Sequence, residues 1–289
     1  YASTPGGGLV FGSELKAVLT HPHVKRDLDP LSMRQFLAFD FVPMERSIYA
    51  GIKKLRPGER LIWQGGHHEV QVFATAPPNR PMIDSGEAAH TALWEALVAS
   101  VGSRLMADVP LGVFLSGGLD SAAVVAALGE HRDLSTLSTF SIGFEDRSFD
   151  ESSRARQVAA HFGTDHHEEQ LTASAMLELV PQIMALGDEP FADPSVVPTY
   201  LLAQFARQHI TVALSGDGGD EHLWGYPTFY AEGWASKAAR IPEVIRHPLS
   251  QLLTRLVPDG FGHMSLGFKL RRFLSGLDHE PLARHVNWV

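Results

Sequence analysis

Residues 116–121 read Ser116-Gly117-Gly118-Leu119-Asp120-Ser121. Apolar runs over 109–115 and 122–128 flank them, which predicts a strand, a glycine-rich turn and a helix in that order. Glycines let the backbone pass close to a phosphate, and a helix N-terminus presents unpaired N–H groups and partial positive charge. Ser116 and Ser121 add hydroxyl donors, and Asp120 is suited to hold a divalent metal that bridges phosphates. The stretch therefore predicts a phosphate-binding turn, because a structural turn needs only one glycine and a cap.

A second glycine-rich loop follows another apolar strand and reads Ser215-Gly216-Asp217-Gly218-Gly219-Asp220-Glu221. Neither loop has the lysine of the Gly-x-x-x-x-Gly-Lys-Ser/Thr phosphate loop. At adjacent strand ends, Asp120 and Asp220 would share one Mg²⁺, which prefers few carboxylates together with phosphate oxygens and water. The two loops together predict a metal–phosphate site.

Strands and helices alternate from residue 86 onward. Strands are expected at 111–115, 137–142 and 210–214, and a strand-like segment follows residue 162 and reaches residue 170. Helices are expected at 86–105, 122–128, 151–162, 173–186 and 196–208. After about residue 220 the chain reads as mainly helical. This alternation predicts a parallel α/β sheet with ligands at the C-terminal ends of its strands.

The first 75 residues have a different character, with short strands, short helices at 14–19 and 30–39, and a hairpin turning at Gly65-Gly66. Phe36, Phe39 and Phe41 are expected in the core rather than in a ligand site. A stiff proline-rich stretch at 76–81 marks a linker. The predicted domains are therefore residues 1–75, a linker over 76–85, and a second domain over 86–289.

Composition limits the classes of function. The chain has 289 residues, no cysteine and a formal net charge of −9, which argues against a nucleic-acid partner and excludes disulfides and a cysteine nucleophile. No apolar stretch is as long as a membrane span, so no membrane partner is expected. A cytoplasmic enzyme fits best, and a homodimer is compatible with the sequence. Because the chain opens on Tyr1 and ends on Val289, we expect it to be a piece of a longer protein.

Several blocks in a fixed order resemble the glutamine-hydrolysing asparagine synthetases. They are Gly12-Ser13-Glu14-Leu15-Lys16-Ala17, Gly51-Ile52-Lys53-Lys54-Leu55-Arg56-Pro57-Gly58, Leu115 to Ser121, Phe140-Ser141-Ile142-Gly143-Phe144, Phe149-Asp150-Glu151, His161 to Glu168, Asp188-Glu189-Pro190-Phe191-Ala192-Asp193-Pro194-Ser195, and Leu214 to Glu221. The resemblance implies a parallel-sheet pyrophosphate-loop synthetase domain, similar to the adenine nucleotide α-hydrolases. It also implies that residues 1–75 are the C-terminal part of an α+β glutaminase domain of the N-terminal-nucleophile class.

The resemblance further implies ATP as a substrate, Mg²⁺ as a cofactor, and amide synthesis through an acyl-adenylate. Aspartate or a related carboxylic acid would be activated, and ammonia derived from glutamine would form the amide. By position, Leu115, Ile142, Ser215 and Gly216 would bind ATP, and Ser116, Gly117, Gly118 and Ser121 would hold pyrophosphate. Asp120 and Asp220 would ligate Mg²⁺, and Asp217 matches an acidic residue tied to forming the intermediate.

The chain departs from the family pattern in four places. The cysteine nucleophile of the glutaminase is absent, and Lys269 lies on an expected helix face rather than where the family's late catalytic lysine would be. Trp224 stands where the family usually has a glycine. The segment around Asp193 is closer to divergent bacterial members than to strictly aspartate-using enzymes.

Two other functions remain open. A ring-closing paralogue, such as a β-lactam synthetase or a lasso-peptide cyclase, would use the same two loops with an internal amine. A non-catalytic nucleotide-binding remnant is the other, although intact Asp120, Asp217 and Asp220 argue against decay of the site.

Overall fold

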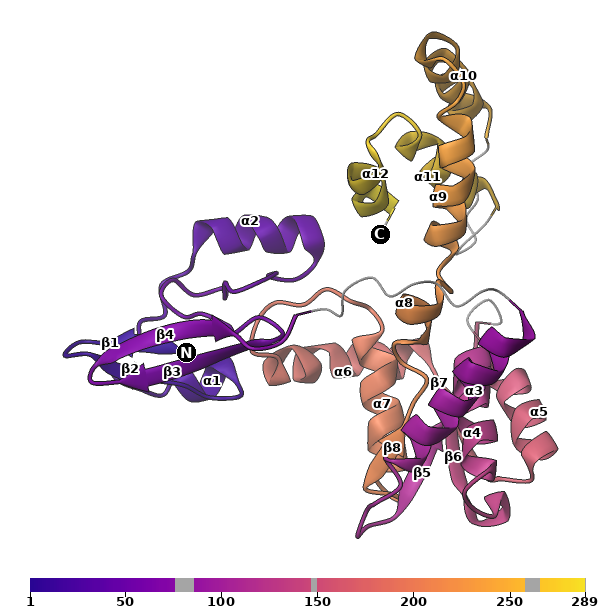
Figure 1. Ribbon diagram of the computed structural model, residues 1–289, viewed down its shortest axis with the longest axis horizontal. Helices are drawn as coiled ribbons and strands as arrows, with labels where there is room; N and C mark the ends of the chain where they lie inside the picture. Colours follow the sequence, from indigo (N-terminus) through magenta and orange to yellow (C-terminus); the bar gives the residue numbers. More distant parts are fainter. Residues whose placement is uncertain (76–85, 147–149, 258–265, 289) are drawn as a thin grey trace. The chain divides into compact units, whose positions relative to one another are not determined.

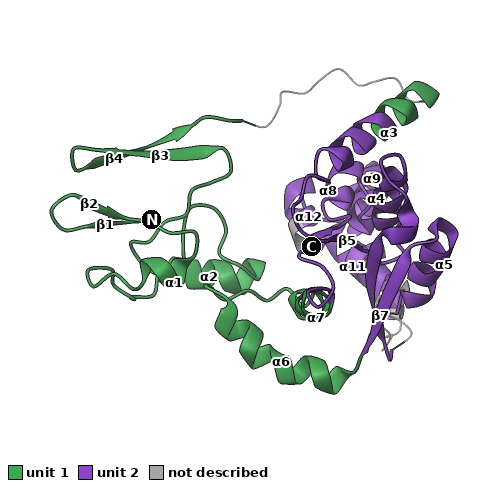
Figure 2. Ribbon diagram, turned by 90° about the horizontal axis from the view of Figure 1, so that it is seen from below, with its two compact units in different colours: residues 1–93, 171–205 green, residues 94–170, 206–289 purple. Residues whose placement is uncertain are grey.

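The computed structural model describes four stretches of the chain, which are residues 1–75, 86–146, 150–257 and 266–288. The expected linker over 76–85 lies outside the described residues, as does Phe149. The chain divides into two compact units (Figures 1 and 2), one comprising residues 1–93 and 171–205, the other comprising 94–170 and 206–289. A segment from the middle of the sequence therefore belongs to the same unit as the N-terminal residues.

Two antiparallel hairpins lie in the first unit. They are β1 (Ala2–Thr4) with β2 (Gly8–Val10), and β3 (Glu59–Gln64) with β4 (His67–Val72). Gly65 and Gly66 connect β3 to β4 with φ angles of 59° and 82°, which glycine adopts without steric cost. The predicted hairpin is confirmed, whereas the first hairpin was visible in the sequence only as a strand-like run near residue 10.

The two short N-terminal helices are α1 (Leu15–Val18) and α2 (Pro30–Phe39). The carboxylate of Asp29 accepts the Leu31 N–H at 3.3 Å and so caps α2, while Pro30 occupies its first turn. Asp40 ends the helix in the left-handed conformation at φ 65°. These end signals explain why the observed bounds of α2 are the predicted ones.

The core of the N-terminal part is small and forms around Ala2, Val18 and Ile52. The prediction that the nearby phenylalanines are core residues is wrong for Phe39 and Phe41, which are 44% and 47% exposed, whereas Phe36 is half-buried. The inward position of α2 is taken by Ser32, which is fully buried and donates a hydrogen bond to Asp29 at 2.7 Å.

The second unit is built on a four-stranded sheet with the order β7-β6-β5-β8. Its strands are β5 (Leu111–Phe114), β6 (Ser138–Phe144), β7 (Asp165–Leu171) and β8 (Val212–Leu214). β5 runs parallel to both β6 and β8, so the loops that leave β5 and β8 emerge from neighbouring strands at one sheet edge. The predicted parallel α/β sheet is confirmed.

Helices pack against this sheet. They are α3 (Glu87–Gly102), α4 (Leu119–Gly129) and α5 (Ser152–Phe162), with the 3-10 turn η1 (Leu134–Thr136) before β6. α4 contacts β5 and α5 contacts β6 (Figure 1). Val113, Val125 and Leu128 are fully buried in this core. Their burial fixes β5 against α4 and so holds the connecting loop at both ends.

The remaining helices are α6 (Ala173–Leu186), α7 (Val196–Ala206), α8 (Gly219–Leu223), α9 (Pro227–Ala238), α10 (Glu243–Leu256), α11 (Leu266–Gly276) and α12 (Pro281–Trp288). The helical character expected after residue 220 is confirmed. In this part Arg284, only 3% exposed, pairs with Glu232, which joins α12 to α9. None of the described helices has the length and apolarity needed to cross a membrane.

Candidate functional site

The first glycine-rich loop joins β5 to α4 and is closed by its own serines. The Ser116 and Ser121 hydroxyl oxygens lie 3.1 Å apart, and the Gly118 N–H donates to Ser116 Oγ at 3.2 Å. Gly118 is the extended N-cap residue of α4, and no side chain caps the helix there. The first turn of α4 therefore begins one residue after the glycines and includes Asp120, three residues earlier than predicted.

Gly117 is needed for steric reasons as well as for its conformation. Its φ of 79° is unfavourable for any residue with a side chain. A Cβ at this position would lie 2.5 Å from the backbone nitrogen of Ala155 and 2.6 Å from Arg154 Cβ. The loop thus passes against the start of α5 with room only for glycine.

The second loop joins β8 to α8 and lies directly against the first. A Cβ on Gly216 would be 2.7 Å from the Ser121 backbone nitrogen and 2.9 Å from Asp120 Cβ. A Cβ on Gly219 would be 2.5 Å from the Asp120 carboxylate. The prediction that the two loops meet is therefore confirmed by their close backbone approach.

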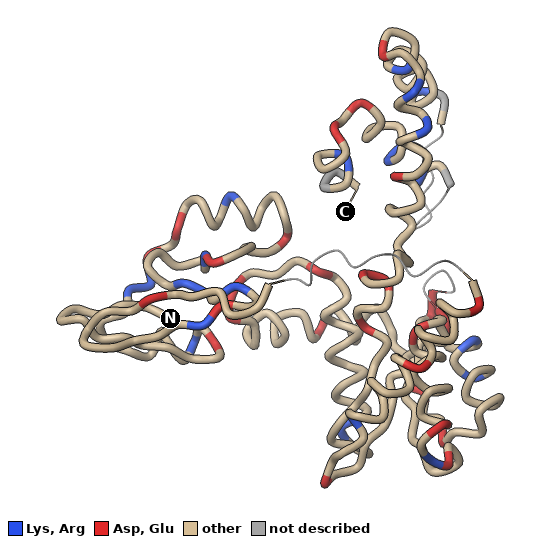
Figure 3. Tube along the Cα trace, viewed as in Figure 1, with Lys and Arg blue, Asp and Glu red and all other residues tan. Residues whose placement is uncertain are grey.

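Acidic residues gather where the loops meet, and α8 carries two of them, Asp220 and Glu221 (Figure 3). Asp217 precedes this helix. Burial raises the pKa of Asp120, and the charges of Asp220 and Glu221 raise it further. Within the described residues no lysine or arginine forms an ion pair with Asp120 or Asp220. This uncompensated negative charge fits a divalent cation.

The described residues contain no group of three or more His, Asp or Glu side chains placed to hold a metal by themselves. Magnesium commonly takes one or two carboxylates and completes its shell with substrate phosphates and water. Asp120 and Asp220 supply that number, so the donor set fits Mg²⁺ bound together with a phosphate ligand better than a site made only of protein.

Ser215 and Asp217 form the outer part of the second loop. The Ser215 hydroxyl donates to Asp217 Oδ2 at 2.8 Å, and Asp217 is exposed. Leu115 is buried, and its N–H donates to the Phe140 carbonyl at 2.8 Å. Ile142 lies further along the same strand, β6, and is half-buried. The structure thus places Ile142 on β6, Leu115 directly after β5, and Ser215 and Asp217 in the loop after β8, and these three strands are adjacent.

Sequence reasoning gave no role to Tyr226, which supports the second loop. Its hydroxyl donates to Glu221 Oε1 at 2.6 Å, and this hydrogen bond raises the pKa of Tyr226 to about 12. The same bond lowers the pKa of Glu221. Nearby, Trp224 is 67% exposed in the left-handed conformation and stacks on Phe229 at 5.3 Å. The only sequence signal for the Tyr226–Glu221 hydrogen bond was a tyrosine a few residues after an acidic loop.

We expect Tyr226→Phe to lower the melting temperature slightly at pH 7, because Glu221 loses its donor. A carboxylate whose pKa is lowered by folding stabilises the protein above its unfolded pKa and loses that contribution as the pH falls. The difference between the variant and the natural protein should therefore shrink near pH 3.5–4, close to the ordinary pKa of Glu at about 4.3. Thermal unfolding at both pH values tests this, and an unchanged difference would contradict it.

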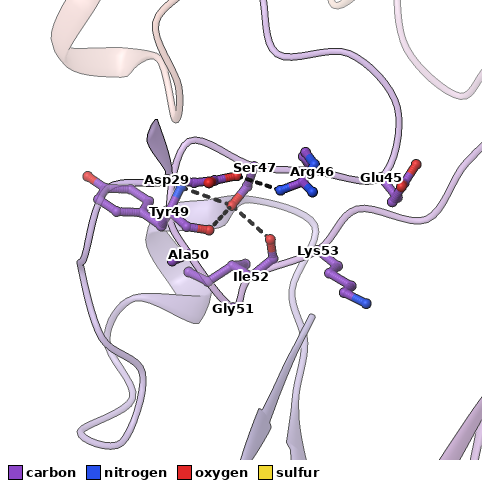
Figure 4. Close-up of a pocket in the computed structure, with 9 residues that line it drawn as sticks. All are labelled: Asp29, Glu45, Arg46, Ser47, Tyr49, Ala50, Gly51, Ile52 and Lys53. Atoms are coloured by element: carbon purple, nitrogen blue, oxygen red, sulfur yellow. Dashed lines mark hydrogen bonds and ion pairs between the residues drawn. The ribbon is translucent and has the colours of Figure 1, made fainter. Parts of the chain in front are cut away.

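A pocket of about 240 Å³ lies elsewhere, in the first unit (Figure 4). Three of its polar side chains take part in hydrogen bonds or ion pairs within it. Arg46 pairs with Asp29 at 2.7 Å, and the buried Ser47 hydroxyl lies 2.9 Å from the carbonyl oxygens of Tyr49 and Ile52. These bonds hold the loop that lines the pocket.

Two family models match the chain. Asparagine synthase matches residues 92–278, which include both glycine-rich loops, and the glutamine amidotransferase domain matches residues 1–74. Because the first of these matches covers more than half of the chain, it assigns the family.

Several named proteins are similar to this chain. A putative glutamine-hydrolysing asparagine synthetase 2 of Methanocaldococcus jannaschii is 35% identical over 90% of this chain and 51% of its own length. The glutamine-hydrolysing asparagine synthetase 1 of Bacillus subtilis is 31% identical over 92% of the chain and 42% of its own length. The amidase chry2 of Gibberella zeae is 27% identical over 75% of the chain and 37% of its own length. The chain thus spans about half or less of the length of these relatives, and its loops, sheet and family match together place it in the asparagine synthase family.

Proposed function

We propose that this chain takes part in ATP-dependent amide synthesis through an acyl-adenylate, with aspartate and ammonia as the first substrates to test. The observation that carries the proposal is the contact between the two glycine-rich loops, where Gly216 abuts the backbone of Ser121 and Asp120. Two such loops on neighbouring parallel strands supply backbone donors, hydroxyls and carboxylates around one point. That combination suits a polyphosphate.

In the proposed reaction, a carboxylate oxygen of the acceptor attacks the α-phosphorus of ATP and pyrophosphate leaves. Ser116, Gly117, Gly118 and Ser121 would hold the pyrophosphate, because they surround the uncapped first turn of α4. Fixed donors around a developing phosphate charge are an effective means of lowering the barrier. Ammonia then attacks the acyl carbon, the bond to AMP breaks, and an amide forms with release of a proton.

The other predicted residues have supporting roles in this proposal. Asp120 and Asp220 would hold Mg²⁺, which when bound neutralises phosphate charge. Leu115, Ile142, Ser215 and Gly216 would contact ATP. Asp217, exposed and oriented by Ser215, would act during formation of the acyl-adenylate. In fold terms, we propose a pyrophosphate-loop synthetase domain over 86–289.

Residues 1–75 would be the C-terminal part of an N-terminal-nucleophile glutaminase domain that supplies ammonia from glutamine. The match of these residues to the glutamine amidotransferase domain supports this assignment. The chain contains no cysteine, so the nucleophile of that reaction would not come from the residues present here.

The acceptor is tested by incubating the full gene product with ATP, Mg²⁺ and ammonia in the presence of individual carboxylic acids. Formation of asparagine that depends on aspartate is expected, and it should be absent without ATP. If an amide forms only with another acid, the proposed reaction through an acyl-adenylate would stand, and that acid would replace aspartate as the proposed substrate. Absence of amide with every acid would overturn the proposed function and favour a nucleotide-binding remnant.

A further inference from the structure

The connection between α6 and α7 carries two neighbouring carboxylates that bind the N-terminal part of the chain. Asp188 accepts the backbone N–H of Leu15 at 2.6 Å and that of Lys16 at 3.3 Å. Glu189 accepts the Ile48 N–H at 3.3 Å and pairs with Lys54 Nζ at 3.0 Å. We name these six residues the carboxylate clasp.

The clasp is shielded from solvent on its acidic side. The side chains of Asp188 and Glu189 are 24% and 16% exposed. Lys54 Nζ also donates to the Val42 carbonyl at 2.7 Å, which fixes the ammonium group in place. Removing either partner of the Lys54–Glu189 pair would leave a partly desolvated charge without its counterion, which costs more than losing a surface ion pair.

The partner surface is preorganised. Between Ile48 and Lys54 in the sequence lies a turn that the buried Ser47 hydroxyl holds through the carbonyl oxygens of Tyr49 and Ile52. Figure 4 shows these two hydrogen bonds. The clasp is also extended by backbone contact, since the Ala192 N–H donates to the Asp40 carbonyl at 2.9 Å. A preformed set of donors binds two carboxylates with little loss of conformational freedom.

Every bond of the clasp crosses between the two family matches. Asp188 and Glu189 lie within the asparagine synthase match over 92–278, and their partners lie within the glutamine amidotransferase match over 1–74. This explains why residues 171–205 belong to the same compact unit as residues 1–93 (Figure 2). From the clasp the chain continues through α7 into β8, whose end carries the second glycine-rich loop.

We propose that Asp188 and Glu189 are positioning residues that hold the amidotransferase and synthase parts in register, so that ammonia released from glutamine is used for amide formation. The inference rests on the proposed function for its catalytic consequence. The clasp contacts belong to the chain itself and involve neither glycine-rich loop. Breaking the clasp should therefore uncouple the two reactions while sparing synthesis supported by added ammonia.

The test uses the full gene product with Lys54→Met, Glu189→Gln and the conservative Lys54→Arg. The matched control is Arg46→Met, because the Arg46–Asp29 pair has side-chain exposures of 44% and 18%, against 40% and 16% for Lys54–Glu189. Both partners of the control pair lie within residues 1–74. The readouts are the amide formed per glutamate released from glutamine, and the rate of amide formation with ammonia.

We expect Lys54→Met and Glu189→Gln to lower the amide-to-glutamate ratio about fivefold or more, with the ammonia-supported rate within about twofold of the natural protein. Lys54→Arg should largely restore the ratio, and Arg46→Met should leave it unchanged. Equal ratios in the clasp variants and the natural protein would overturn the inference. So would an equal loss in Arg46→Met, because that would mean a general effect of destabilising the N-terminal part.

Hydrogen exchange separates this inference from the proposed function. The amide protons of Leu15 and Ile48 should be protected in the natural protein. In Glu189→Ala, which removes the acceptor of the Ile48 N–H, that of Ile48 should exchange faster and that of Leu15 should not. Unchanged Ile48 protection in Glu189→Ala would refute the clasp whatever the reaction is. Faster Ile48 exchange in a protein without amide synthesis would keep the clasp and refute the catalytic consequence together with the proposed function.

Discussion

Asp120→Asn is expected to reduce pyrophosphate release from ATP by about 10³-fold, through loss of a charge at the phosphate site. The same change should raise the melting temperature of the ligand-free protein at pH 7. Burial and the charges of Asp220 and Glu221 raise the pKa of Asp120, so its ionised form is disfavoured in the folded state. Asparagine keeps the shape of the side chain and removes the repulsion.

The sign of the stability effect depends on pH. A carboxyl whose pKa is raised by folding binds its proton more tightly in the folded protein, so ionisation costs stability as the pH rises through the folded pKa. The gain from Asp120→Asn should therefore be largest near neutral pH and vanish below about pH 4, where the unfolded-state carboxyl is also protonated. Thermal unfolding of both proteins at pH 4 and pH 7 measures this.

Asp133→Asn is the control for this prediction. Hydrogen bonds from the backbone N–H and the hydroxyl of Ser135 lower the pKa of Asp133, the opposite of the shift at Asp120. We expect Asp133→Asn to lower the melting temperature slightly at pH 7 and to leave pyrophosphate release unchanged. A loss of stability in Asp120→Asn, or full activity, would contradict the account of the acidic cluster.

Gly117→Ala is expected to destabilise the protein by about 2–4 kcal/mol and to abolish pyrophosphate release. About 1 kcal/mol comes from placing a side chain at positive φ, and about 1–3 kcal/mol from crowding against α5. The crowding is severe because the new Cβ would lie 2.5 Å from the Ala155 backbone nitrogen, which belongs to a packed helix. Relief would require the loop to move, which would displace the donors around the phosphate site.

Gly163→Ala separates conformational strain from crowding. Gly163 ends α5 with a φ of 71°, close to that of Gly117, but a Cβ there would have no neighbour within 4 Å. It should cost only the strain, about 1 kcal/mol, and leave activity intact. Chemical denaturation of both variants gives the two values, and equal losses would show that crowding at the first loop is unimportant.

The fold was predictable where the chain carries local end signals. α2 was predicted with its observed bounds because Asp29 and Pro30 mark its start, and α6 likewise because Thr172 caps it by accepting the Ala175 N–H. The start of α4 was misplaced because its N-cap is a glycine with no capping side chain. The start of α4 depends on the conformation of Gly118 in the loop, and the spacing of apolar residues in the sequence does not predict that conformation.

The two glycine-rich loops were predictable as sequence motifs. Their contact was predictable because each follows a strand of a parallel sheet, and the C-terminal ends of such strands lie at the same edge. The clasp was not predictable, because Asp188 and Leu15 are 173 residues apart and their bond joins a side chain to a backbone group. A bond to a backbone group does not depend on the type of the residue that provides it, so the sequence pattern does not predict such a contact. The exposure of Phe39 and Phe41 was missed for a related reason. Apolar character alone does not tell which residues of a short helix, or of the segment directly after it, find a partner.

The bond of ATP that is broken tests the central claim most directly. The full gene product should be incubated with ATP, Mg²⁺, ammonia and the preferred acid, and the nucleotide and phosphate products resolved by phosphorus NMR. Attack at the α-phosphorus predicts AMP and pyrophosphate in amounts equal to the amide formed. ADP and inorganic phosphate would contradict it, because the acid would then have been activated as an acyl-phosphate and the two loops would not act as a pyrophosphate site.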